Sequence, residues 1–377
     1  MLEIHQINTG RGNAALLIFP DGTSMLLDAG DGGNPPPRGT PPVPDGTRTP
    51  GEWIARYIRH MLAHDASPAL DFGFLTHFHG DHMGSPTAAS KTARGGYKLT
   101  GVSEVGDLIP IKLMLDRGWP DYNYPAPVND AATANYRAFV DWQRKNTGMQ
   151  VERLKPGRND QIVLRRDRAK YPNFEVRNIA ANGEVWTGVG TNTRAHHPPI
   201  ADLKPAEYPT ENMCSMGIRV SYGKFDFYSG GDIPGVHREG APPWHDMETP
   251  VAQAVGPVEA SLLNHHGNRD SQNAFFVSSL RPQVFLIAVW SADHPAHDVL
   301  ERMYSERLYP GPRDVFATNM LEANKLVIGP LLDRLKSSQG HIVVRVNPGG
   351  ETFRVIVLDD SSESYRVKSI HGPYRSR

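Results

Sequence analysis

The feature that most constrains this chain is HFHGDH, residues 77–82, which places three histidines and one aspartate within six residues. It follows residues 71–76, for which the apolar pattern predicts a short buried strand. Imidazole nitrogen and carboxylate oxygen are ligands that zinc prefers, and a tight loop can point adjacent side chains in different directions. A chance run of solvated residues rarely has this density of ligands. The segment therefore predicts two adjacent metal ions, one facing His77 and His79 and the other facing Asp81 and His82.

Two further strand ends carry polar residues that could complete such a site. Asp232 follows the apolar strand 225–228 through two glycines, where a carboxylate could approach and bridge two cations. The alternative is an ordinary turn aspartate. His265 and His266 follow the apolar residues 260–263, and we expect one of this pair to complete the second metal site. Functional side chains in layered α/β folds gather where strands end, because the strands supply a rigid frame.

The rest of the chain alternates predicted strands and helices without a compositional break. We expect an α/β fold formed by a single domain over residues 1–360, with an irregular Gly/Pro-rich loop at 31–50. Thr49 should cap a helix whose apolar face starts at Trp53. Residues 95–208 are the least regular, and we expect them to contain a lid-like insertion, with surface decoration as the alternative. Residues 361–377 should form a polar, poorly ordered tail.

Composition excludes several classes of protein. A net charge of −1 gives no broad basic field for nucleic acid, so such a role would need a local patch. The longest apolar stretches fall far short of the roughly 20 residues that span a bilayer, and the N-terminus does not resemble a secretory signal. The single cysteine, Cys214, fits a cytoplasmic location and leaves a metal site of nitrogen and oxygen ligands.

Together these segments resemble the metallo-β-lactamase superfamily, and within it the ComEC-like branch. The resemblance is carried by HFHGDH, by Gly231-Asp232, by His265-His266-Gly267, and by the residues around them, which are 7–14, 26–30, 211–215 and 293–295. It implies a four-layer αβ/βα sandwich with insertions and a metal site between the edges of two sheets. It also implies that a hydroxide bridging two metal ions is the nucleophile; the ions are expected to be zinc, with manganese or iron as alternatives.

The resemblance also assigns ligands residue by residue. His77 and His79 would bind the first ion, Asp81 and His82 with His265 or His266 would bind the second, and Asp232 would bridge both. Two departures stand out. The family usually has aspartate where this chain has Asn8 and Asn13, and its middle histidine has no clear match. The third ligand of the first ion is therefore left open between four possibilities, which are Asn212, His196, His197 and water.

Hydrolysis of a phosphoester is the function that this resemblance favours, with a small molecule, a nucleotide or a nucleic acid as substrate. Asp81 could bind metal and orient the nucleophile, and His294 or the non-ligand member of the 265/266 pair could protonate the leaving group. Basic residues that could contact phosphate are Arg94, Lys98, Lys112, Arg165, Arg166 and Arg168. The alternatives are a lactone or β-lactam hydrolase and a non-catalytic binding module.

Overall fold

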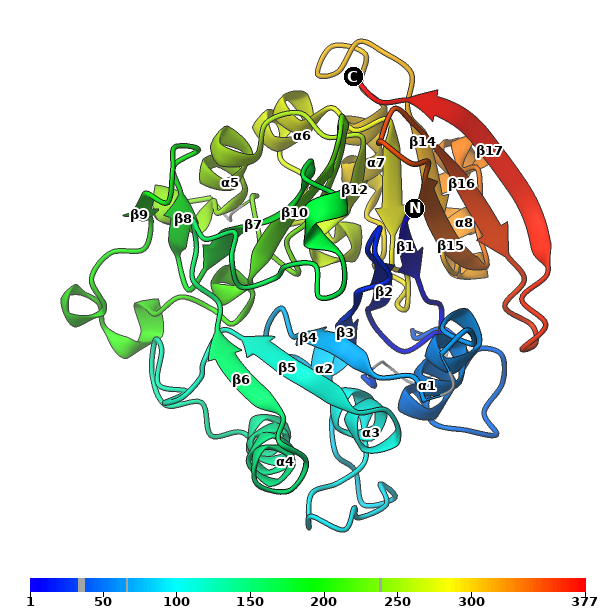
Figure 1. Cartoon of the computed structure of the whole chain (residues 1–377). Helices are drawn as coiled ribbons and strands as arrows, with labels where there is room; N and C mark the ends of the chain where they lie inside the picture. The colour runs from blue at the N-terminus through cyan, green and yellow to red at the C-terminus, as the bar shows by residue number, and fades with distance from the viewer. Residues whose placement is uncertain (33–37, 66, 237–238) are drawn as a thin grey trace.

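Two large sheets form the centre of the molecule (Figure 1). The computed structural model describes residues 1–32, 38–65, 67–236 and 239–377; residues 33–37 of the expected Gly/Pro-rich loop lie outside this description. Within the described residues, the first sheet has the strand order β17 (Val367–Arg375), β16 (Thr352–Leu358), β15 (His341–Val346), β1 (Leu2–Gln6), β2 (Ala14–Ile18), β3 (Ser24–Ala29), β4 (Leu70–Phe74), β5 (Ile111–Asp116) and β6 (Gln150–Arg153).

The second sheet has the strand order β14 (Asp314–Ala317), β13 (Val284–Ile287), β12 (Ala260–Leu262), β11 (Phe225–Ser229), β10 (Gly217–Tyr222), β7 (Phe174–Ala181), β8 (Glu184–Trp186) and β9 (Thr193–Ala195). Both sheets are mixed. Pairing is parallel from β3 to β6 in the first sheet and from β11 to β14 in the second. Because parallel strands run in one direction, their carboxyl ends meet at one edge of each sheet.

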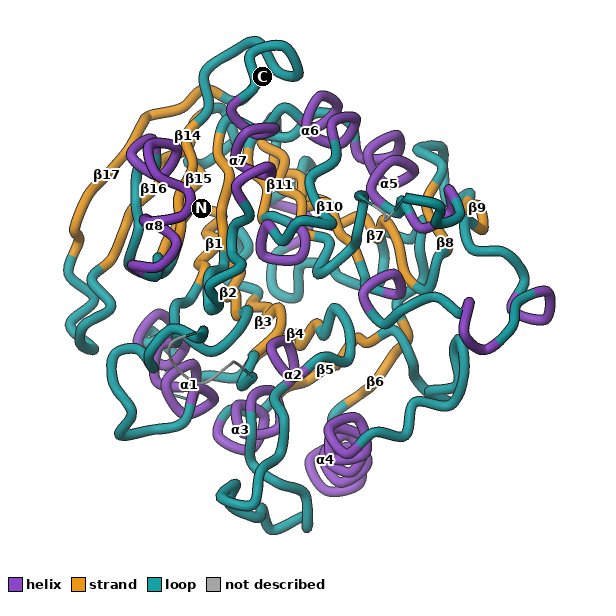
Figure 2. The backbone as a smooth tube through the Cα atoms, turned by 180° about the vertical axis from the view of Figure 1, so that it is seen from behind, coloured by secondary structure: helices purple, strands orange, loops and turns teal. Residues whose placement is uncertain are grey.

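The sheets pack face to face, and helices cover their outer faces (Figures 1 and 2). The core between the sheets joins Phe72 and Leu115 of one to Phe227 and Leu286 of the other. Helices α1 (Pro50–Met61), α3 (Gly101–Leu108) and α4 (Ala131–Thr147) share a second apolar cluster with the first sheet. On the second sheet the covering helices are α5 (Glu248–Val255), α6 (Ala274–Leu280) and α7 (His297–Tyr304). The predicted four-layer αβ/βα sandwich is confirmed.

Local sequence signals explain how α1 begins. The Thr49 side chain accepts a hydrogen bond from the main-chain N–H of Glu52, and Pro50 occupies the first turn, where its missing N–H costs nothing. Trp53 and Ile58 lie on the buried face that packs on the sheet. Among the described residues, no helix is both long enough and apolar enough to cross a membrane.

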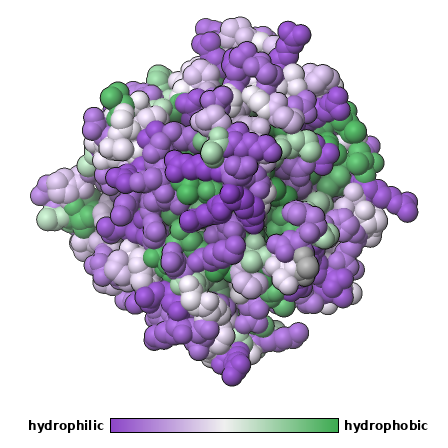
Figure 3. Space-filling view, viewed as in Figure 1, coloured by the Kyte–Doolittle hydropathy of each residue, from purple (hydrophilic) through white to green (hydrophobic). Residues whose placement is uncertain are grey.

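One expectation about the chain's organisation is wrong, and another stays a prediction. Residues 95–208 supply β5 to β9 together with α3 and α4, so much of this region builds the two sheets and their cover, and the lid-like insertion expected within it stays a prediction. Strands β6, β8 and β9 have only three or four residues each, too few for apolar alternation to predict them. The expected poorly ordered tail contains β17, which pairs antiparallel with β16. The side chains of β17 are mostly exposed, which explains its polar sequence. Figure 3 shows that this face of the molecule is largely hydrophilic, with some hydrophobic residues on the side of β16 and β17.

Candidate metal centre

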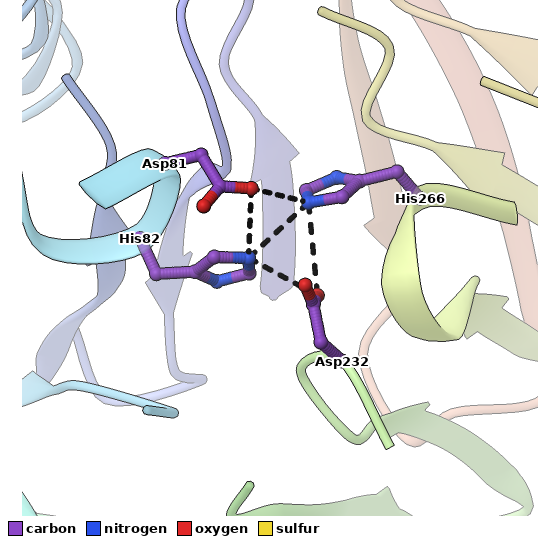
Figure 4. Close-up of side chains that lie close together, drawn as sticks. All are labelled: Asp81, His82, Asp232 and His266. Carbon is purple, nitrogen blue, oxygen red and sulfur yellow. Dashed lines mark hydrogen bonds and ion pairs between the residues drawn. The ribbon is translucent and has the colours of Figure 1, made fainter. Parts of the chain in front are cut away.

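Four of the predicted ligands, Asp81, His82, Asp232 and His266, lie close together (Figure 4) on segments that follow strands of both sheets. From the first sheet, the loop after β4 contains His77 and His79. The one-turn helix α2 (Gly80–Met83), which follows this loop, contains Asp81 and His82. From the second sheet, Asp232 follows β11, and His266 lies in the helical turn Asn264–Gly267 after β12. The carboxyl ends of the parallel strands therefore bring ligands from three distant parts of the sequence to one place.

Four side chains form what we call the second donor set: Asp81, His82, Asp232 and His266. His82 Nε2 lies 3.0 Å from Asp232 Oδ1 and 3.2 Å from His266 Nε2, and His266 Nε2 lies 3.1 Å from Asp81 Oδ2. Four donors around a tetrahedral zinc ion, each at about 2.0–2.2 Å from it, lie about 3.3 Å apart. The spacing of this set fits such an ion.

The first donor set consists of His77, His79 and Asp232. His77 Nε2 lies 3.1 Å from His79 Nδ1 and 3.6 Å from Asp232 Oδ2. Asp232 therefore turns one carboxylate oxygen toward each set, as a bridging ligand would. The set offers three protein donors, so one tetrahedral position would be left for another ligand.

Asp28, at the end of β3, orients the second donor set. Its Oδ2 accepts hydrogen bonds from His82 Nδ1 (2.7 Å), from the Thr76 hydroxyl (2.9 Å) and from Asn13 Nδ2 (2.9 Å). With Nδ1 engaged, His82 presents Nε2 to the metal position. Asn13 donates a hydrogen bond that an aspartate could not. Asp28 lies at a strand end, but no local sequence pattern indicates its role.

His266 is held in the same way by the main chain. Its Nδ1 lies 3.0 Å from the Ala288 carbonyl oxygen, which can only accept a hydrogen bond, so Nδ1 is the donor and Nε2 faces the other members of the donor set. The residue has a positive φ of 55°, a conformation that non-glycine residues rarely adopt. Such strain at a ligand-bearing turn is typical of functional sites. Of the predicted pair, the structure places His266 in the second donor set and His265 in neither set.

Glycines allow the main chain of Asp81 to approach β2 and β3 closely. A Cβ atom at Gly30 would lie 2.0 Å from the Asp81 carbonyl oxygen, and one at Gly12 would lie 2.3 Å from it. The same oxygen accepts a hydrogen bond from the Asn13 N–H at 2.7 Å. The glycine turn near the N-terminus thus fixes the loop that carries Asp81 and His82, which is a structural role rather than a phosphate-binding one.

Burial and charge act in opposite directions on these groups. Burial works to raise the pKa of Asp81 and of Asp232, but the adjacent His82 and His266 hold both pKa values below their usual range. Burial works to lower the pKa of His82, whereas Asp232, Asp81 and Asp28 raise it well above normal. Burial, reinforced by His82, lowers the pKa of His77. A compact cluster of alternating charges results, and cations would replace its protons.

His265 lies beside the first donor set. Its Nδ1 is 2.6 Å from Asp270 Oδ1, and its Nε2 is 3.7 Å from Asp232 Oδ2 and 3.3 Å from Asn212 Nδ2. Burial works to lower the pKa of His265, but Asp232 and Asp270 raise it to about 9. In the metal-free protein this imidazole can therefore hold a proton at neutral pH.

His294 lies in a different environment. It is buried, its ring stacks on the ring of His266 with a centroid distance of 4.7 Å, and burial together with His266 lowers its pKa to about 3. At neutral pH it is therefore an uncharged imidazole and a poor proton donor. These surroundings favour His265 over His294 for protonating a leaving group.

A cavity of about 230 Å³ opens beside both donor sets. Its lining includes His79, Asp81, Asp232 and His266 from those sets, together with Arg38, Asn212, His265, Asn268, Trp290, Ser291, Asp293 and His294. None of the lining residues comes from 95–208, so the basic residues expected there to contact phosphate do not line it. Lys112 and Arg166 instead pair with Asp71 at the opposite end of β4.

The candidates for the third ligand of the first ion separate clearly. Neither His196 nor His197 lines the cavity, and His197 Nδ1 is hydrogen-bonded to the Tyr124 hydroxyl at 2.8 Å. Asn212 lines the cavity, and its Oδ1 is buried without a hydrogen-bond partner. A buried oxygen without a partner is unusual and fits an environment that a cation would complete. The donor chemistry of the site therefore fits metal binding.

Comparison with known proteins gives structural likenesses at low sequence identity. No family model and no curated protein matches the sequence. Among solved structures, zinc-bound PqqB from Methylobacterium extorquens aligns with a TM-score of 0.35 and 10% identity, over 72% of this chain and 75% of PqqB. A protein of unknown function from Enterococcus faecalis V583 aligns with a TM-score of 0.31 and 12% identity, over 89% of this chain and 64% of its own. At these values neither likeness identifies a function.

Proposed function

We propose that this chain is a metal-dependent hydrolase of the metallo-β-lactamase superfamily that acts on phosphoesters. The observation that carries the proposal is the pair of donor sets sharing Asp232, with one carboxylate oxygen directed to each. Two cations held in this way supply a hydroxide nucleophile near neutral pH and stabilise the attacking and leaving oxygens of a displacement. Zinc suits the nitrogen and oxygen donors, and manganese and iron are alternatives.

The residues around the cavity have separate tasks in this proposal. Asp81 and Asp232 keep the negative charge that holds the cations, and Asp28 fixes the imidazole of His82. His265, oriented by Asp270, can give a proton from Nε2 to a leaving alkoxide. Arg38, at the rim of the cavity, offers a guanidinium for a phosphate oxygen.

Phosphoesters are favoured over lactones and β-lactams because two cations at such a site can clamp both ends of an in-line displacement at phosphorus. The cavity also carries polar lining residues rather than an apolar wall for an acyl chain. A non-catalytic binding module on the same scaffold is the remaining alternative. It is disfavoured because both donor sets are intact.

The test is hydrolysis of bis(p-nitrophenyl) phosphate by protein reconstituted with zinc or manganese, alongside a panel of lactones and β-lactams. Asp81→Ala should lose turnover, because Asp81 belongs to the second donor set. Asp71→Asn is the matched control, since Asp71 is a buried carboxylate at the opposite end of β4. Turnover confined to lactones would mean that the substrates are lactones rather than phosphoesters. No turnover of any ester, or equal turnover by Asp81→Ala, would remove the proposal.

A further inference from the structure

A buried ion pair lies directly behind the first donor set. Arg117 follows β5, its side chain is only 1% exposed, and it is among the largest fully buried side chains of the described residues. Its guanidinium binds the Glu211 carboxylate in a two-pronged pair, with Nε 2.7 Å from Oε1 and Nη2 bonded to Oε2. Such a pair fixes the direction of both groups as well as their charge.

The remaining bonds of Arg117 tie the two sheets together. Its Nη1 donates to the Tyr124 carbonyl oxygen and to Asn182 Oδ1, each at 3.0 Å. Asn182, which follows β7 of the second sheet, donates from Nδ2 to the Arg117 carbonyl oxygen at 2.8 Å. A buried charge is expensive unless it is paired and hydrogen-bonded, and here each nitrogen of the guanidinium donates to an acceptor. The position of Glu211 is therefore fixed from both sheets.

Glu211 reaches the metal-binding loop at Phe78, the residue between the ligands His77 and His79. The Phe78 N–H donates to Glu211 Oε1 at 2.7 Å. The Phe78 ring is also held, because the Arg117 guanidinium lies over it at 4.6 Å from the ring centre. Both the main chain and the side chain of Phe78 thus depend on the same ion pair.

The next residue along the chain extends the network to the cavity. Asn212 follows Glu211 and lines the cavity beside His79 and His265. The second donor set is supported by other groups, namely Asp28 and the Ala288 carbonyl oxygen. The Arg117–Glu211 ion pair therefore contacts the loop of the first donor set and not the groups that support the second.

We propose that Arg117 and Glu211 are positioning residues for the first metal ion: they fix the loop that aims His77 and His79, and they place Asn212 next to it. This inference rests on the proposed function, since it requires that the first donor set binds metal. A purely structural ion pair would change the stability of the fold without changing the affinity of one ion relative to the other.

The experiment measures the affinities of both ions by titrating metal-free protein with Co²⁺ and Zn²⁺, with the visible absorption of Co²⁺ as the signature of each site. Glu211→Ala removes the partner of the Phe78 N–H, whereas Glu211→Gln keeps an acceptor but loses the charge. Loss of a group that orients a ligand typically weakens metal binding about 10–100-fold. We expect that loss for one ion only, larger for Ala than for Gln, with the Co²⁺ spectrum of the other ion unchanged.

Two further variants separate positioning from stability. Asp226→Asn breaks a comparable two-pronged pair with Arg219 at the start of β11, with bonds of 3.0 and 2.7 Å, far along the strand from Asp232. It should leave both affinities unchanged. If removing Glu211 alone prevents folding by stranding the charge of Arg117, the double variant Arg117→Met with Glu211→Gln removes both charges together. It should also weaken one ion selectively.

The outcomes are distinct. Equal weakening of both ions, or unchanged affinities in folded Glu211 variants, would overturn the positioning role and leave the proposed function intact. If wild-type protein binds only one ion, or none, the premise that both donor sets bind metal fails, and the positioning role is overturned with it. Binding of no ion would also remove the proposed hydrolase.

Discussion

The two donor sets share Asp232 but differ in how their other ligands are held. In the second set, the outer nitrogens of His82 and His266 are engaged by Asp28 and by the Ala288 carbonyl oxygen. In the first set, the Thr76 hydroxyl contacts His77 Nδ1, but His79 is exposed, and among the described residues only three side chains contribute. One set is preorganised for a cation, and the other is open. We therefore expect the second ion to bind more tightly and the first to accept a ligand from the substrate.

The largest effect should come from the ligand that the two sets share. Asp232→Asn removes a carboxylate charge from both, so both ions should be weakened by more than about 100-fold, beyond the range for groups that only orient a ligand. Metal content after dialysis and turnover should fall together. Asp226→Asn, on the strand that Asp232 follows, is the matched control. Retention of one tightly bound ion by Asp232→Asn would show that the sets do not share this ligand.

How far the sequence predicts this centre depends on where each ligand lies. HFHGDH could be interpreted directly, because its ligands are adjacent in sequence and follow a recognisable strand. Asp232 required only the rule that side chains gather at strand ends. The choice between His265 and His266 could not be made, since it depends on two residues with positive φ that turn adjacent side chains in different directions.

The supporting groups were harder to predict, because they are polar residues without a local pattern. Asp28 precedes His82 by many residues, and only the parallel pairing of β3 with β4 brings them together. Arg117 follows β5 of the first sheet, whereas Glu211 precedes β10 of the second. Three strands of the region 95–208 were hard to predict for a related reason: β6, β8 and β9 have only three or four residues, and β6 is only partly buried, so alternation of apolar residues is weak there. Tertiary contacts rather than local periodicity define these elements.

A smaller effect, mainly on the second ion, should follow from changing Asp28, which supports the second donor set. Asp28→Asn keeps the shape of the side chain but removes the charge that holds His82 Nδ1. The second ion should be weakened about 10–100-fold, and the first less, because Asp28 reaches His77 only through the Thr76 hydroxyl. Titration with Co²⁺ would resolve the two ions, and Asp71→Asn supplies a buried-carboxylate control. Equal weakening of both ions would mean that the two sets are not independently supported.

The smallest effect is a difference in proton release. The pKa of His82 is raised well above its usual value, so in metal-free protein at neutral pH it holds a proton that the second ion must displace. The pKa of His77 is lowered, so the first ion displaces no proton there. The affinity of the second ion should therefore rise with pH from neutral pH upward, by up to about tenfold per unit, while that of the first stays nearly flat. Calorimetry in buffers of different ionisation enthalpy measures the released protons directly.

Asp28→Asn should reduce the release of protons on metal binding, because Asp28 helps to raise the pKa of His82. Equal release at both sites would contradict the contrast between a preorganised, charged set and an open, neutral one.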